Sequence, residues 1–303
     1  MSFSQLIKAA FKKAERTRIE ALLPASPSVT FAGLRLERSY MWNDIVSRVK
    51  TFNQMHDWQE NTLHPCFLQV LGLELQLGCL LDKSFPFPVM GLVHIANQVQ
   101  IVSPLHPADY SLRAEISALK RHEKGAVVSV NITASSEGKE VYSATSDYLY
   151  RMASSRPTSN RDDRPSVMGL GTKLLDISLA KNAGRRYAKL SRDYNPIHLW
   201  SITAKVLGFK QPIAHGMHTL SLCMSALSKN AGPQHSLNRI ENRFIAPAPL
   251  PCQVSLYTRE FELGRDGEHP FLLVNRQDVV ADNALAESKR PIIDGTFQFE
   301  SLG

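Results

Sequence analysis

The sequence predicts an α+β protein made of two similar units, in each of which an antiparallel sheet wraps around a nearly all-apolar helix. Three observations support this prediction. Each half of the chain contains an apolar helical segment followed by several extended segments, the order of these elements is the same in both halves, and a polar segment lies between them. At 303 residues the chain is long enough for two such units.

In the first half, a helix is predicted over residues 63–81. Its apolar residues cover most of the helix circumference, which is typical of a helix buried on nearly all sides. Val128, Val130 and Ile132 alternate with polar residues, the period-two pattern of a half-buried strand. Extended segments are predicted at residues 89–102, 112–119, 127–133 and 141–150.

An amphipathic segment, residues 3–23, precedes this first unit. Its apolar residues recur at helical spacing opposite a Lys and Arg face. We expect such a helix to pack on its own domain or on a partner subunit. Binding to a membrane surface is the alternative.

The second half repeats the same order of elements. A helix is predicted from His215 to about Leu227, and residues 100–104 resemble residues 243–247, which supports a duplication. Extended segments are predicted at residues 237–245, 254–261, 271–280 and 295–299. We therefore expect an N-terminal domain over residues 1–151, a Ser- and Pro-rich linker over 152–167 and a C-terminal domain over 168–303.

The composition limits the classes of partner and compartment. The formal net charge is +7, but the basic residues are distributed along the chain and form no nucleic-acid-binding motif, so we expect no nucleic-acid partner. The charge fits attraction to a phosphorylated ligand or an acidic carrier protein, or a solvated basic surface. With no bilayer-spanning segment and no secretory signal, a cytoplasmic protein is expected. The four widely spaced cysteines indicate buried apolar residues rather than a metal site, and no cofactor is expected.

One short motif carries a candidate catalytic pair. Asp193 and His198 are separated by Asn195 and Pro196. Pro196 fixes its own φ and disfavours the helical region for Asn195, so the chain must turn and the two side chains can converge. A carboxylate and an imidazole that reach the same water form an acid/base pair. The alternative is structural, because Asp-x-Asn-Pro is also a common turn signature.

A second motif, His215-Gly216-Met217, lies 17 residues after His198 and opens the predicted helix. A helix N-terminus presents unpaired N–H groups and the positive end of its dipole. A glycine at this point lets a ligand approach the backbone closely. This arrangement can polarise a carbonyl oxygen without a metal.

Together these two motifs resemble the signature of the MaoC-like hydratases, the (R)-specific enoyl-CoA hydratase and 3-hydroxyacyl-thioester dehydratase family. The resemblance implies the double hot-dog form, with two antiparallel sheets each wrapped around a central helix and packed as a pseudo-dimer. The first half has no Asp-x-Asn-Pro-x-His. Its nearest remnants are His56-Asp57 and His64-Pro65, to which we assign no chemistry, so the first unit is expected to be degenerate.

The resemblance also implies a mechanism. Asp193 and His198 hold the water that adds to the β-carbon of a 2-enoyl thioester, and the Gly216 N–H stabilises the developing oxyanion. The remaining site residues are supporting ones: Ser191 to orient Asp193, Asn195 to shape the turn, His215 to place Gly216, and Met217 beside it. The substrate is an acyl-CoA or acyl-carrier-protein thioester, and a homodimer is one candidate assembly.

Two departures from the family pattern are visible. Arg192 stands where a Gly often precedes the catalytic Asp, and residues 248–251 replace a common turn. The alternatives to a hydratase are a hot-dog thioesterase and a non-catalytic acyl-CoA-binding subunit. We also expect Phe85 and Phe87 to line an acyl tunnel, or else to fill the core of the first domain.

Overall fold

The computed structural model describes residues 12–23, 34–59, 62–152, 171–258, 267–279 and 291–301. The first part of the expected amphipathic helix and nearly all of the expected linker lie outside these ranges. Within them, the last part of the amphipathic segment forms a helix, α2 (Arg16–Leu22).

The first half contains the predicted helix and meander together with an additional strand and helix that precede them. In chain order the elements are β1 (Arg35–Tyr40), α3 (Trp42–His56), α4 (Pro65–Leu71), α5 (Leu73–Leu81), β2 (Leu92–Ile101), β3 (Tyr110–His122), β4 (Gly125–Ser136) and β5 (Lys139–Arg151).

The second half has the same plan, with three short helical segments inserted before its long helix. The elements are β6 (Thr172–Leu179), α6 (Ala183–Ser191), the 3-10 turn η2 (Pro196–His198), α7 (Ser201–Val206), α8 (Gly216–Ala231), β7 (His235–Phe244), β8 (Cys252–Thr258), β9 (His269–Asn275), the 3-10 turn η3 (Arg276–Asp278) and β10 (Ile293–Ser301).

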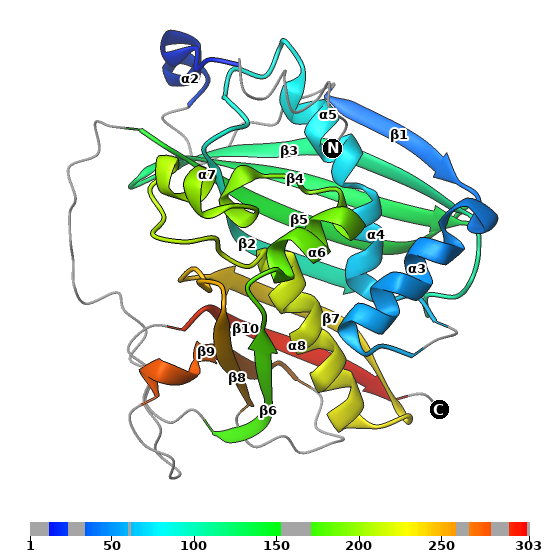
Figure 1. The fold of residues 1–303 in the computed structure, drawn as a ribbon. Helices are drawn as coiled ribbons and strands as arrows, with labels where there is room; N and C mark the ends of the chain where they lie inside the picture. Colours follow the sequence, from blue (N-terminus) through cyan, green and yellow to red (C-terminus); the bar gives the residue numbers. More distant parts are fainter. Residues whose placement is uncertain are drawn as a thin grey trace.

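The described strands form one antiparallel sheet in the order β1-β3-β4-β5-β2-β7-β10-β9-β8-β6 (Figure 1). The two halves join where β2 pairs with β7, from Ala96 opposite Arg243 to Gln100 opposite Arg239. Helices α4, α5 and α8 lie across the same face of this sheet. This architecture is a double hot-dog, so the predicted fold class is confirmed, and the two predicted sheets meet edge to edge as one.

The two central helices contact each other at the junction of the halves. Every residue of α4 is buried, as its apolar sequence predicts. The Cys66 Sγ lies 3.2 Å from the Met224 Sδ on α8, and the His64 Nε2 donates to the Ser221 carbonyl at 3.1 Å. One cluster of buried apolar side chains therefore runs through both halves.

The helix predicted over residues 63–81 is interrupted at Gly72, which separates α4 from α5. A Cβ at this position would lie 2.6 Å from the Ile132 Cδ1 on β4. A larger residue at this position would require the Ile132 side chain to shift. The strand predicted over residues 271–280 is also too long, because the Asn275 side chain accepts from the Gln277 N–H and starts a 3-10 turn.

Among the described residues, no helix is long and apolar enough to cross a membrane. The four cysteines are free, and Cys66, Cys79 and Cys223 are buried, as expected for small apolar residues. Burial raises the pKa of the Cys66 thiol to about 12, so this thiol is unreactive at neutral pH.

Candidate active site

The first candidate residue, Asp193, lies in a tight turn after helix α6. That helix ends at Arg192, which adopts the left-handed conformation with φ 62°. The Asp193 N–H then donates to the Ser191 Oγ at 3.1 Å, and the Asp193 Oδ1 accepts from the Asn195 N–H at 3.1 Å. Ser191 thus contacts the backbone of Asp193 rather than its carboxylate. Each of these two side chains therefore accepts a hydrogen bond from the backbone N–H two residues further along the chain.

Asn195 performs the turn-shaping role that the sequence predicts. Its Oδ1 accepts from the Ile197 N–H at 3.4 Å and caps the 3-10 turn η2 that carries His198. Pro196 occupies the first position of that turn, where no N–H is needed. The Asn-Pro pair therefore directs the chain back toward Asp193.

His198 is 8% exposed and its protonation pattern is fixed by one contact. Its Nδ1 donates to the Ile213 carbonyl at 2.8 Å, which leaves the Nε2 with a free lone pair. Burial lowers the pKa of His198, and this outweighs the opposite effects of the Asp193 carboxylate and the Ile213 carbonyl. The imidazole is therefore neutral at neutral pH and able to accept a proton.

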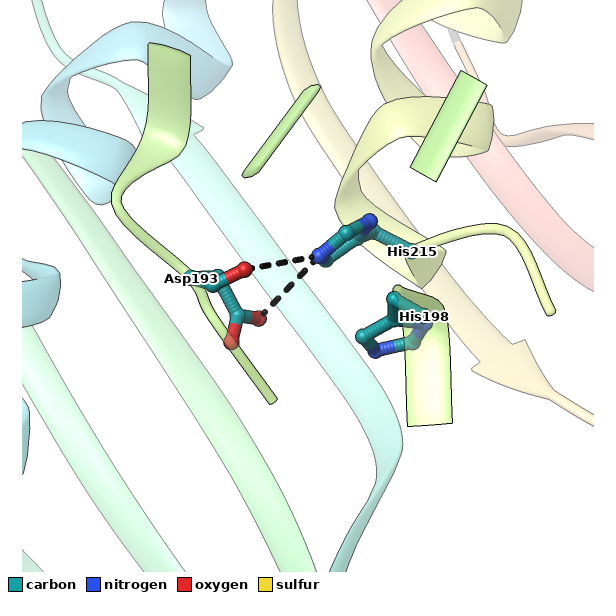
Figure 2. A group of neighbouring side chains, drawn as sticks. All are labelled: Asp193, His198 and His215. Atoms are coloured by element: carbon teal, nitrogen blue, oxygen red, sulfur yellow. Dashed lines mark hydrogen bonds and ion pairs between the residues drawn. The ribbon is translucent and has the colours of Figure 1, made fainter. Parts of the chain in front are cut away.

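His215 lies beside both residues, as Figure 2 shows. Its Nε2 donates to the Asp193 carbonyl at 3.1 Å and lies 3.9 Å from the Asp193 Oδ2. Its ring stacks on the His198 ring with centroids 3.7 Å apart. Burial and the neighbouring His198 hold the pKa of His215 well below its usual range. A neutral ring in this position holds the Asp193 backbone in place.

The acid and the base are close enough to share a water. A carboxylate oxygen of Asp193 and a ring nitrogen of His198 lie within 4.8 Å of each other. Two hydrogen bonds of about 2.8 Å, meeting at one bent water, reach across roughly 5 Å. The structure therefore brings Asp193 and His198 within reach of one water.

Gly216 is the first residue of α8, and His215 makes no side-chain cap bond to this helix. The N–H groups of a helix's first turn have no partner within the helix. A Cβ on Gly216 would lie 2.7 Å from the Phe244 ring, so glycine is required here for space. Gly216 and Met217 are half-buried, and the N-terminus of α8 lies directly after His215, which contacts Asp193 and His198.

One residue near the site was not identified from the sequence. His94 lies on β2 in the first half and contacts the Phe244 ring with centroids 4.9 Å apart. It also stacks on Tyr148 at 4.8 Å, and the Asp193 carboxylate is near enough to affect its pKa, which burial lowers to about 4. Among the described residues its buried Nε2 has no hydrogen-bond partner. Only the strand register brings His94 here, so no local pattern could have identified it.

A metal ion is an alternative ligand for part of this site. Donor atoms of Asp193, His198 and His215 all lie within 4.8 Å of one another, a spacing that a cation could bridge. The His198 Nδ1 and the His215 Nε2 are, however, already bonded to the carbonyls of Ile213 and Asp193.

The remnants in the first half have structural contacts. The His56 Nε2 lies 2.9 Å from the His218 Nδ1 on α8, and Asp57 forms an ion pair with Lys229. Phe85 and Phe87 are fully buried and contact each other with ring centroids 5.1 Å apart. These two phenylalanines belong to the main apolar core, which was the alternative to the acyl tunnel.

Comparison with known proteins identifies a family that matches the second half of the chain. The family described as "MaoC like domain" matches residues 168–276, which include both motifs and the turn between them.

Two curated relatives and one solved structure extend the comparison. The chain is 30% identical over 188 residues to the 3-hydroxyacyl-thioester dehydratase X of Mycobacterium tuberculosis and 28% identical over 199 residues to the peroxisomal enoyl-CoA hydratase 2 of Arabidopsis thaliana. Each match covers 60% of this chain, and 65% and 64% of the two relatives respectively, slightly less than two thirds of their lengths. The crystal structure of HtdX of Mycobacterium tuberculosis matches with a TM-score of 0.68 and 21% identity, over 88% of this chain and 100% of that chain.

Proposed function

Because residues 168–276 of this chain match the family described as "MaoC like domain", we propose that the protein hydrates trans-2-enoyl thioesters and, in reverse, dehydrates 3-hydroxyacyl thioesters. The observation that carries this proposal is the position of Asp193 and His198, with donor atoms within 4.8 Å of each other. The N-terminus of α8 directly follows His215, which contacts both residues. The names of the two relatives support the same reaction in both directions.

In the hydration direction, Asp193 and His198 hold one water against the β-carbon of the enoyl group. The pair removes one proton from this water as its oxygen bonds to the β-carbon, and a proton is delivered to the α-carbon. After the water oxygen bonds to the β-carbon and before the α-carbon receives its proton, negative charge develops on the thioester carbonyl oxygen. The Gly216 N–H, at the positive end of the α8 dipole, stabilises that charge.

The supporting residues hold this arrangement. Ser191 and Asn195 fix the turn, and His215 fixes the Asp193 backbone through a 3.1 Å hydrogen bond. We infer that the reaction gives the (R)-3-hydroxyacyl product, as the family resemblance implies. We also infer one active site per chain, because the first half has no counterpart of Asp193 and His198.

The test is hydration of crotonyl-CoA, followed by loss of the absorbance of the conjugated thioester. Release of free CoA thiol, measured in the same reaction with a thiol reagent, identifies a thioesterase instead. Binding of acyl-CoA with neither change identifies a non-catalytic subunit. Chromatography of the product on a chiral phase decides the stereochemistry, and an (S)-product contradicts that part of the proposal.

A further inference from the structure

An exposed apolar surface follows the catalytic turn directly. Trp200, Ile202, Val206 and Leu207 lie on or beside helix α7, and their exposed fractions are 56, 79, 81 and 41%. Scattered exposed apolar side chains are ordinary, whereas a contiguous group indicates an interaction site. A six-residue helix with Ile and Val about four-fifths exposed is such a group.

This surface is attached to the active site. The Thr203 Oγ1 donates to the Pro196 carbonyl at 2.7 Å, so α7 packs on the turn that carries His198. On the other side, the Arg185 guanidinium of α6 lies 4.5 Å from the centroid of the Trp200 ring and donates to the Leu199 carbonyl at 3.0 Å. Helices α6 and α7 lie on the same side of the sheet as α4 and α8 (Figure 1).

The same segment holds most of the net charge of the chain. Residues 181–212 contain seven Lys and Arg but one acidic residue, Asp193, which leaves +6 of the total of +7. Basic residues occur along the whole chain, but in this segment almost no acidic residues balance them. The exposed members are Lys181, Arg186, Lys189, Arg192, Lys205 and Lys210. Together with the apolar residues of α7 they form what we call the α6–α7 surface.

We propose that the α6–α7 surface docks an acidic acyl-carrier protein that delivers its thioester to Asp193 and His198. This proposal rests on the proposed function and specifies the carrier of its substrate. Protein interfaces combine apolar residues with charged ones, and the α6–α7 surface offers both. Complementary charge steers an acidic partner to such a surface.

Two other occupants fit these observations less well. The phosphates of CoA need cations, but they do not cover four apolar side chains spread over α7. A second copy of this chain would bring another +6 segment to the same place, and like charges placed opposite each other disfavour association.

The experiment compares one crotonyl group on three carriers: an acyl-carrier protein, CoA and pantetheine. The variants are Ile202→Ser/Val206→Ser and Lys205→Glu/Lys210→Glu. The matched controls, Val93→Ser/Leu175→Ser and Lys120→Glu/Lys139→Glu, change exposed residues outside the α6–α7 surface. We expect both α7 variants to lower kcat/KM with the carrier protein by about tenfold or more. With pantetheine, we expect both α7 variants to keep the kcat/KM of the parent protein. With CoA, we expect the Ile202→Ser/Val206→Ser variant to keep it as well.

Affinity for the carrier protein, measured by fluorescence anisotropy, gives a readout that does not depend on turnover. If the parent binds the carrier protein but hydrates no thioester, the proposed reaction is wrong and the docking surface stands. If both variants lose the same factor in kcat/KM with CoA and with the carrier protein, the docking proposal is wrong. It is also wrong if kcat/KM with the carrier protein does not change. A change from dimer to monomer in the serine variant would assign the surface to a second copy. Loss of binding to anionic vesicles with intact carrier-protein kinetics would assign it to a membrane.

Discussion

Helices α4 and α8 begin at corresponding points of the two halves, each directly after a histidine, yet their N-termini differ. In α4, Pro65 has no N–H, and the His64 Nδ1 accepts from the Cys66 N–H at 3.0 Å. In α8, Gly216 retains its N–H and the His215 ring makes no cap bond, because its Nε2 contacts the Asp193 carbonyl instead. One N-terminus is closed by its own histidine and the other is open.

The difference shows what converts a helix N-terminus into a site. Every helix presents unpaired N–H groups at its start, but they can bind a ligand only if no proline or side-chain cap has removed them. In α4, proline removes one N–H and the His64 side chain caps another, and the whole helix is buried. In α8 the histidine is redirected to the turn that bears the acid. The same residue type therefore stabilises the fold in one half and positions the catalytic turn in the other.

The largest expected effect comes from the acid and the base. Asp193→Asn and His198→Ala should each lower kcat/KM for crotonyl-CoA by about 10²–10⁴-fold, because general acid/base catalysis contributes about this much. Circular dichroism should show an intact fold. Asp57→Asn, in the remnant of the first half, is the matched control and should keep its activity. If Asp57→Asn lowered kcat/KM as much, the proposal that only the second half is catalytic would be wrong.

The next effect isolates the N-terminus of α8. Gly216→Pro makes this position identical to Pro65, and His215 already has the extended ψ of 134° that a residue before proline requires. Loss of one oxyanion donor lowers kcat by about 10²–10³-fold. Gly216→Ala brings the same Cβ contact with Phe244 but keeps the N–H, so comparison of the two variants separates the effect of the Cβ from that of proline's missing N–H and ring. Equal kcat in both variants would contradict the oxyanion role.

The pH dependence should show that His198 acts as a neutral base. Because burial lowers the pKa of His198, protonation begins below its usual value of about 6.5. The kcat/KM should therefore be constant at neutral pH and fall by about tenfold per pH unit on the acid side. A rate that rises on acidification would show that the imidazolium is the active form.

The histidine of the first half should affect stability instead of catalysis. His64→Ala removes the cap of α4 and the contact with the Ser221 carbonyl, and we expect it to lower the free energy of unfolding by about 1–3 kcal/mol. The kcat of the folded enzyme should change little. Chemical denaturation checks the first expectation, with His106→Ala, an exposed position, as the control. A large fall in kcat with unchanged stability would mean that α4 also takes part in catalysis.

The smallest expected effect is that of metal removal. If Asp193, His198 and His215 hold a water, dialysis against a chelator leaves kcat/KM unchanged. A loss that added Zn²⁺ or Mn²⁺ restores would assign the three residues to a metal site and change the proposed chemistry.

The sequence predicts the local parts of this molecule well. Asp193, His198 and Gly216 lie within one short segment, and the Asn195–Pro196 turn that joins Asp193 to His198 forms from neighbouring residues alone. The contact between Gly72 and the Ile132 side chain was not predictable, because β4 lies much later in the chain. His94 was missed for the same reason, since it reaches the site through pairing between distant strands. Helical and alternating patterns report on local structure, whereas these positions depend on tertiary packing.

The pairing of β2 with β7 has a consequence for how the two halves can change. In a symmetric dimer of identical chains, any substitution at a helix N-terminus occurs twice, so closing one site also closes the other. Here both helices belong to one polypeptide, and Pro65 can seal one while Gly216 leaves the other open. The continuous sheet still holds both helices in the geometry of a symmetric pair. A substitution at the start of one helix therefore leaves the start of the other unchanged, and the two N-termini of one continuous sheet can differ in chemistry.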